Sequence, residues 1–283
     1  MAGVASSATA VLIGYIAAGT SKIRVGSGGI MLPNHAPLII AEQFGTLASL
    51  YPGRIDLGLG RAPGTDRLTA LAIRGEHFRA ELNFPEDIQK IQTFFSAANS
   101  NRNVRAIPGE GLDIPIWVLG SSTDSAVVAA AMGLPYAFAS HFAPTHFLAA
   151  IELYRKNFQP SAHLDKPYVM ACVNVVAADT DAAASLLATS VQQLFLGVVS
   201  GQRKLLQPPV DTMDAIWSRE ESLMVQQMLS CSFIGSREKI EGEMQDFLER
   251  TKVNEVMATS HIYDPEARLY SYDIFAQVMQ HSA

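Results

Sequence analysis

The sequence is poor in cysteine and has no cluster of basic residues. Its 283 residues include only two cysteines, Cys172 and Cys231, and no CxxC motif. This favours a reducing cytoplasm over a disulfide framework and excludes a thiolate zinc site. The net charge is -6 and no run of Lys and Arg is present, which argues against a nucleic-acid-binding surface. We therefore expect a cytoplasmic protein without a metal or a nucleic-acid partner.

The sequence also lacks long apolar runs. None approaches the roughly 20 residues that a membrane-spanning helix needs. The longest early run, residues 10–18, resembles the core of a signal peptide, but the first basic residue, Lys22, comes after it. Because a signal peptide carries positive charge before its apolar core, we expect neither export nor a membrane partner.

One stretch, residues 23–66, has the pattern of a complete β/α/β unit. Residues 23–32 are an apolar run with β-branched side chains, and residues 38–50 carry apolar side chains at helical spacing. A Pro-Gly pair then stops the helix, and residues 55–59 are expected to form a second strand. Strands joined by a helix lie parallel in one sheet. The glycine-containing loops after both strands therefore open on the carboxyl edge, where α/β proteins bind ligands.

The alternation of strands and helices continues along the chain and predicts a parallel α/β fold. Six strands are expected, at residues 23–32, 55–59, 114–119, 135–140, 168–177 and 255–262. A doubly wound open sheet fits this count. A (β/α)8 barrel needs eight strands, so two strands would be missing before the first expected helix, residues 6–19. Residues 200–232 carry a proline-bearing loop followed by a helix at about residues 213–229.

A cluster of hydroxyl side chains lies where the strand 114–119 becomes a helix. Ser121, Ser122, Thr123 and Ser125 occupy four of five positions there. Backbone amides and hydroxyls at the positive end of a helix form an anion site, and phosphate is its usual ligand. Plain N-capping is the alternative, because Ser and Thr are favoured caps.

Arg61 follows Gly58-Leu59-Gly60 at the carboxyl end of the second strand. Its guanidinium is placed to reach the same phosphate through two hydrogen bonds. Alternatively, Arg61 forms an ion pair with Asp66 or Glu76 that stabilises the loop. The GLGRAPG run is not a dinucleotide-binding fingerprint, because its glycine spacing is wrong and a proline interrupts it.

Glycines and histidines follow other strand ends on the same edge. Gly28 and Gly29 permit close approach of a flat ligand, or they relieve crowding between strands. His35 and His141 both follow strand ends, where a histidine is able to move protons. A structural role is the alternative for each, and we select His141 as the candidate catalytic residue.

The run RVGSGGIMLPNHAPLIIAEQFGTLASLYPGRIDLGLGRAPGTD is followed in order by IPIWVLGSSTDSA and AFASHFAP. Together these motifs resemble the bacterial luciferase-like flavin-dependent monooxygenases, and the resemblance extends over essentially the whole chain. It implies one domain, residues 1–283, with a (β/α)8 TIM-type barrel and a late helical insertion. The family's first two strands, and an active-site histidine that ends the second, would lie before Met1. We therefore expect a barrel that lacks its first two strands at the N-terminus.

The resemblance also implies roles for individual residues. Arg61 matches the arginine that holds the flavin phosphate. Ser121, Ser122 and Ser125 match the phosphate-contacting turn, and Gly28-Gly29 matches the segment against the flavin ring. The cofactor implied is reduced FMN, or the deazaflavin F420 in some branches.

The activity implied is that of a monooxygenase, in which O2 adds to reduced FMN and the flavin C4a-peroxide oxidises a small organic substrate such as an aldehyde. The partners expected are the substrate and a separate flavin reductase, and a homodimer is compatible with the family. Two alternatives stay open. One is an F420-dependent hydride-transfer oxidoreductase, and the other is a catalytically inactive flavin-binding relative.

Overall fold

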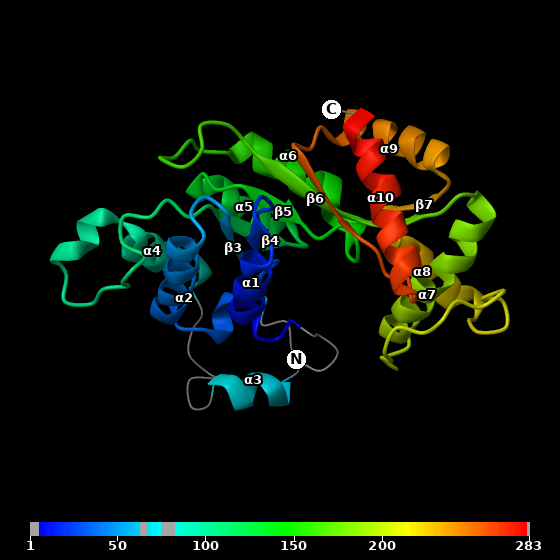
Figure 1. Cartoon of the computed structure of the whole chain (residues 1–283), viewed down its shortest axis with the longest axis horizontal. Coiled ribbons are helices and arrows are strands. Elements are labelled where there is room, and N and C mark those ends of the chain that lie inside the picture. The colour runs from blue at the N-terminus through cyan, green and yellow to red at the C-terminus, as the bar shows by residue number, and fades with distance from the viewer. Residues whose placement is uncertain (1–5, 63–66, 75–82, 282–283) are drawn as a thin grey trace. The chain divides into compact units, whose positions relative to one another are not determined.

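The computed structural model describes residues 6–62, 67–74 and 83–281 (Figure 1). The chain forms two compact units. The first unit is Met1–Gly120, Asp124–Tyr136 and Leu153–Pro167, and the second is Ser121–Thr123, Ala137–Glu152 and Tyr168–Ala283. Strand β5, Tyr136–Phe138, carries the chain from the first unit into the second.

The first unit contains a set of parallel strands. They are β1 (Val25–Gly26), β2 (Ile30–Met31), β3 (Ile55–Gly60) and β4 (Ile116–Gly120). Both β1 and β2 pair with β3, and β3 pairs with β4. The single strand expected at residues 23–32 is thus present as two short pieces, interrupted at the cis Gly28-Gly29 peptide.

The described residues of the first unit also form helices. They are α1 (Thr9–Ala18), α2 (Pro37–Leu50), α3 (Arg67–Arg74), α4 (Phe84–Phe95) and α5 (Thr123–Met132), with short 3-10 turns at Leu32–Asn34 and Ala97–Asn101 (Figure 1). The alternation of a strand places Leu57, Leu59 and Val118 on the helix-covered face, where they are fully buried. Apolar side chains of α2 bury against them, among them Ile40 and Phe44.

Arg54 fixes the end of α1 to the start of β3. Its guanidinium donates hydrogen bonds to the carbonyl oxygens of Ala17, Thr20 and Ile23. The last carbonyls of a helix have no partner within the helix and carry partial negative charge, so a cation there is favourable. This contact sets where the first helix meets the sheet.

The second unit is organised around the long strand β6, Val169–Ala177. It pairs in parallel with β7 (Ser232–Gly235) and with β8 (Glu255–Thr259). Its helices are α7 (Asp181–Val199), α8 (Arg219–Met228), α9 (Arg237–Thr251) and α10 (Pro265–His281). Helix α6 (Phe147–Asn157) follows a 3-10 turn, Pro144–His146, and begins in this unit. Helix α10 contacts both β6 and α9 (Figure 1).

All six predicted strands are present, and the parallel α/β prediction is confirmed. Strand β7 was not predicted, because its four residues are too short to show an alternating pattern. The helix expected at residues 213–229 begins only at Arg219. Ser218 and Glu221 form a capping box there, in which each side chain accepts a hydrogen bond from the other residue's backbone N–H.

One helix among the described residues, α7, is long and apolar enough to cross a membrane by length and composition alone. The apolar runs of the sequence had predicted no such segment. In the structure, Ala188, Val191 and Phe195 of this helix belong to a buried cluster with Val225 of α8 and Val176 of β6. The apolar side of α7 is therefore used in the core of the second unit.

Candidate functional site

The guanidinium of Arg61 lies at the first turn of α5. Its Nη2 is 2.9 Å from a carboxylate oxygen of Asp124, so the loop after β3 and the helix after β4 meet at these two residues. Both side chains are substantially exposed, at 48% and 66%. The alternative partners considered for Arg61, Asp66 and Glu76, lie outside the described residues. The structure brings Arg61 to the predicted turn, while an exposed ion pair of this kind contributes little to stability.

Ser125 lies beneath that turn. Its hydroxyl oxygen is 3.1 Å from the phenol oxygen of Tyr136, and its side chain is buried. A Cβ on Gly120 would lie only 1.8 Å from the same hydroxyl oxygen, so only glycine fits there. Burial raises the pKa of Tyr136 to about 12. Ser125 thus supports the turn from inside, and its predicted contact with a phosphate stays a prediction.

The other hydroxyl residues of the turn are more accessible. Ser121 is exposed and Ser122 is half-buried, and both immediately precede α5. Asp124 places a negative charge in the first turn of the helix, which is favourable at its positive end.

Gly28 and Gly29 have different surroundings. A Cβ on Gly29 would approach the carbonyl oxygen of Gly58 to 2.7 Å, so crowding between β2 and β3 accounts for this glycine. At Gly28, a Cβ would meet nothing within 4 Å. Gly28 is therefore the position of this pair that is open to a ligand.

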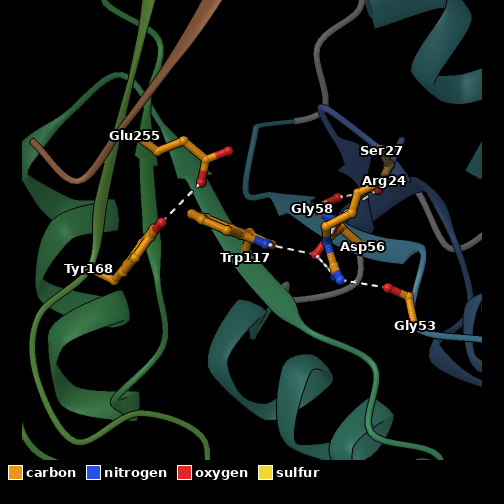
Figure 2. A network of polar contacts seen from close by, with 8 residues as sticks. All are labelled: Arg24, Ser27, Gly53, Asp56, Gly58, Trp117, Tyr168 and Glu255. Carbon is orange, nitrogen blue, oxygen red and sulfur yellow. Dashed lines mark hydrogen bonds and ion pairs between the residues drawn. The ribbon is translucent and has the colours of Figure 1, made fainter. Parts of the chain in front are cut away.

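A polar network occupies the strand face away from the helices (Figure 2). Arg24 makes a two-bond ion pair with Asp56, at 2.8 and 2.9 Å, and also donates to the carbonyl of Gly53. The indole N–H of Trp117 donates to the same carboxylate at 3.2 Å. In the second unit, the phenol of Tyr168 donates to Glu255 at 3.3 Å. Because Arg24 and Asp56 join the starts of β1 and β3, away from the carboxyl edge, this network serves the fold.

The second unit places two histidines at strand ends. His141 follows β5 and His261 follows β8. The side-chain N–H of Asn174, in β6, donates to the backbone carbonyl of His141 and to Ser232, and its oxygen accepts from Thr259. Asn174 is paired in register with Ser232 on β7 and Thr259 on β8. This buried amide therefore connects the loop that carries His141 to the strand that leads to His261.

The pKa values of both imidazoles lie below the ordinary value. Burial, with His261 nearby, lowers the pKa of His141 to about 4. Burial and the charge of Arg268 lower the pKa of His261. The Nδ1 atoms of both rings are buried and have no hydrogen-bond partner within the described part of the chain. Such atoms are rare in folded proteins, where nearly all buried polar groups are hydrogen-bonded.

His261 was not selected from the sequence, because the expected strand 255–262 includes it, whereas the observed β8 ends at Thr259. His35, the other strand-end histidine, lies in the first unit after the 3-10 turn Leu32–Asn34, with its side chain exposed. The described residues hold no group of three His, Cys, Asp or Glu side chains suited to a metal ion.

Comparison with curated proteins finds close relatives over nearly the whole chain. The chain is 54% identical over 277 residues to YvbT of Bacillus subtilis, which covers 98% of this chain and 82% of that protein. It is 50% identical over 281 residues to a luciferase-like monooxygenase of Escherichia coli, at 99% and 84% coverage. A shorter match, 40% identical over 140 residues, is to the N-acetyl-S-alkylcysteine monooxygenase of B. subtilis, at 48% and 42% coverage.

Solved structures share the fold. Apo-MsnO8 is 29% identical with a TM-score of 0.81, covering 96% of this chain and 81% of that one. More distant structures show the fold alone. The oxygenating constituent of 3,6-diketocamphane monooxygenase from Pseudomonas putida, in complex with FMN, has a TM-score of 0.64 at 15% identity, with 94% and 81% coverage. The F420-dependent tetrahydromethanopterin reductase of Methanopyrus kandleri has a TM-score of 0.69 at 16% identity, with 97% and 87% coverage.

These matches confirm the fold class predicted from the sequence, the TIM-barrel type, over the open-sheet alternative. They agree with a family model, that of the luciferase-like monooxygenases, which matches residues 2–255. Its span includes the β3 and β4 strand ends, the Arg61–Asp124 pair and the loop of His141. The chain therefore belongs to the luciferase-like monooxygenase family.

Proposed function

We propose that this protein is a flavin-dependent monooxygenase that uses reduced FMN and O2 to oxidise a small organic substrate. The observation that carries the proposal is the Arg61–Asp124 pair at the first turn of α5, within a chain of the luciferase-like monooxygenase family. The naming of two relatives as monooxygenases and the FMN complex of a structural neighbour support it. A cytoplasmic location and a separate flavin reductase as partner are part of the same proposal.

The residues of the first unit fit a flavin phosphate. An exposed guanidinium at the N-terminal turn of a helix combines charge with backbone N–H groups. The carboxylate of Asp124 now satisfies Arg61, and a phosphate would take over that position. Arg61, at the first turn of α5, would hold the phosphate, and the open position at Gly28 would receive the ring system. Ser121 and Ser122 precede that turn in the chain and stay predicted phosphate contacts. Ser125 would contribute by supporting the turn.

Reduced FMN, when bound, supplies the electrons that activate O2. The protein's part is to hold and orient the reactants and to exclude water. His141 is the proposed catalytic residue, because its imidazole is neutral at pH 7 and its buried Nδ1 has no partner among the described residues. A neutral imidazole is able to accept a hydrogen bond at that atom or, in the other tautomer, to donate one from it.

Cofactor titration tests the proposal. We expect reduced FMN to bind more tightly than F420, and substrate-dependent O2 consumption to appear when a flavin reductase is added. Tighter binding of F420 would favour the hydride-transfer alternative, for which an F420-dependent enzyme of the same fold is a precedent. FMN binding without turnover of any candidate thioether or aldehyde would favour the inactive flavin-binding relative.

A further inference from the structure

His141 lies in a tight turn, residues 139–143, that follows β5. Within this turn the backbone N–H groups of Phe142 and Ala143 donate to the carbonyl oxygen of Ala139, at 3.4 and 3.1 Å. These bonds join residues three and four positions apart, as in a single turn of helix. Because they are local, they shape the turn without fixing where it lies against the sheet of the second unit.

Two side-chain hydrogen bonds attach the turn to β6. The hydroxyl of Ser140 donates to the carbonyl oxygen of Cys172, at 2.5 Å. The side-chain N–H of Asn174 donates to the carbonyl oxygen of His141, also at 2.5 Å. Cys172 and Asn174 are two positions apart on one strand, and Ser140 and His141 are neighbours in the turn. Two consecutive residues of the turn are therefore bonded to one short stretch of β6.

Both of these side chains are shielded from water and well placed. Ser140 is 0% exposed and Asn174 is 1% exposed, so water cannot readily replace either bond when the side chain is removed. The amide of Asn174 also donates to Ser232 of β7 and accepts from Thr259 of β8, each at 3.2 Å. Its orientation is thus fixed by the two neighbouring strands as well as by the turn.

The imidazole of His141 depends on where this turn lies. The ring is in edge-to-face contact with that of Phe142, the next residue of the turn, with centroids 4.7 Å apart and an angle of 84° between the planes. Once the backbone is fixed, only the two side-chain torsions of a histidine remain to move its ring, and these occupy a few preferred values. Holding the His141 carbonyl therefore limits the positions that the imidazole reaches.

We propose that Ser140 and Asn174 are positioning residues, whose hydrogen bonds between β6 and the turn keep the imidazole of His141 where the monooxygenase reaction needs it. Neither side chain is assigned a contact with the substrate or with FMN, because both act through His141. This inference rests on the proposed function, in which His141 is the catalytic residue. A displacement of about 1 Å is able to cost a catalytic group roughly a hundredfold in rate, so the turn matters for turnover even in a folded protein.

Hydrogen exchange of the purified protein tests the inference without any substrate. Ser140→Ala and Asn174→Ala each remove one of the two bonds to β6. Each variant should speed exchange of the Phe142 and Ala143 amides about tenfold or more, since a lost buried hydrogen bond makes local opening easier. Urea denaturation of each variant gives the share of exchange that passes through global unfolding, and this share is subtracted. Ser140→Ala is the milder change and gives the answer if Asn174→Ala does not fold.

The chain offers a matched control for each variant. Ser190→Ala removes another fully buried hydroxyl of the second unit, which has no hydrogen-bond partner in the part of the chain that the structure describes. Asn157→Ala removes an exposed amide that donates to Leu153. Both controls should leave exchange of the Phe142 and Ala143 amides within about twofold of the wild type.

The imidazole supplies a second measurement. Burial and the nearby His261 hold the pKa of His141 at about 4. When the turn is released, water reaches the ring more easily, so in Ser140→Ala and Asn174→Ala this pKa should rise to roughly 5 or higher. Titration by NMR measures it, and His141→Gln assigns the signal.

Three results would overturn the inference. The first is unchanged exchange and an unchanged pKa of His141 in both variants. The second is an equal change in the Ser190→Ala and Asn157→Ala controls. The third is faster exchange with an unchanged pKa of His141, because the turn would then move without carrying the ring.

The outcome is separable from that of the proposed function. With FMN, a reductase and a substrate that the wild type oxidises, kcat of both variants should fall about tenfold or more, while the Kd of FMN stays within about twofold. Wild-type turnover by a variant whose turn is released would contradict only the positioning role. A turn held as described, in a protein that neither binds FMN nor consumes O2, would contradict only the monooxygenase proposal.

Discussion

The guanidinium of Arg61 is 2.9 Å from the carboxylate of Asp124, 63 residues further along the chain. This contact joins the loop after β3 to the first turn of α5. In the proposed function, Asp124 occupies the position that a flavin phosphate would take, so the pair is both a fold contact and a competitor of the cofactor.

Replacing Arg61 should separate phosphate recognition from ring recognition. Arg61→Ala is expected to weaken FMN binding by tenfold to a hundredfold, since a charge-assisted contact to phosphate is worth roughly 1.5–3 kcal/mol. Riboflavin, which has no phosphate, should bind as before. Fluorescence titration with both flavins measures this, and Arg105→Ala, which breaks the Arg105–Glu110 pair of the same unit, is the matched control. Equal losses for FMN and riboflavin would rule out the phosphate role.

Removing the competing carboxylate should have the opposite effect. Asp124→Asn releases Arg61 and is expected to strengthen FMN binding several-fold. The free energy of unfolding should change by less than about 1 kcal/mol, because both side chains of the ion pair are exposed. Flavin titration and urea denaturation give the two values. Weaker FMN binding in Asp124→Asn would show that Asp124 helps to hold the cofactor.

Gly120 should not tolerate a side chain. Gly120→Ala would place a Cβ 1.8 Å from the Ser125 hydroxyl oxygen, and we expect a loss of about 1–3 kcal/mol in the free energy of unfolding. Ser125→Gly in the same chain removes the obstacle and should recover part of the loss. Gly242→Ala is the control, since nothing lies within 4 Å there and alanine favours the helix. A Gly120→Ala protein as stable as the wild type would contradict this packing.

Asn174 should be essential for the stability of the second unit. Asn174→Ala leaves the His141 carbonyl without its buried donor and removes one of the two hydrogen bonds of the Thr259 hydroxyl, at a cost of about 1–3 kcal/mol. Asn157→Ala removes one exposed hydrogen bond to Leu153 and should cost far less. Urea denaturation measures the loss in the free energy of unfolding for both variants. Equal losses would show that the buried Asn174 amide stabilises the protein no more than an exposed hydrogen bond does.

The buried histidine should make the protein acid-sensitive. The pKa of His141 is about 4 in the folded protein, against an ordinary value of 6.5. Between pH 6.5 and 4, His141 is therefore protonated in the unfolded chain but not in the folded chain. The free energy of unfolding falls as the pH drops through this range. The loss due to His141 is on the order of 3 kcal/mol.

Denaturation at pH 7 and pH 5 checks this expectation. His141→Gln should lose much less stability between these values than the wild type does. His163→Gln, which changes an exposed loop histidine, should keep the wild-type dependence. The same loss in His141→Gln as in the wild type would assign the acid sensitivity to other groups.

Local patterns in the sequence determined the parallel α/β class, all six expected strands and the strand-end positions of Arg61, Gly28 and His141. These features depend on side chains a few residues apart, whose periodicity and turn residues are visible in one segment. The resemblance to the family was likewise recognisable from motifs that are contiguous in the sequence.

Tertiary structure alone decided which distant groups meet. It paired Arg61 with Asp124, turned Ser125 inward to Tyr136 and placed His261 beside His141. It also formed β7, whose four residues are too few to show a sequence pattern. This strand is stabilised by its parallel pairing with β6. The physical reason is the same throughout: a strand end fixes where a side chain starts, whereas its burial and partners depend on the elements that the fold packs against it.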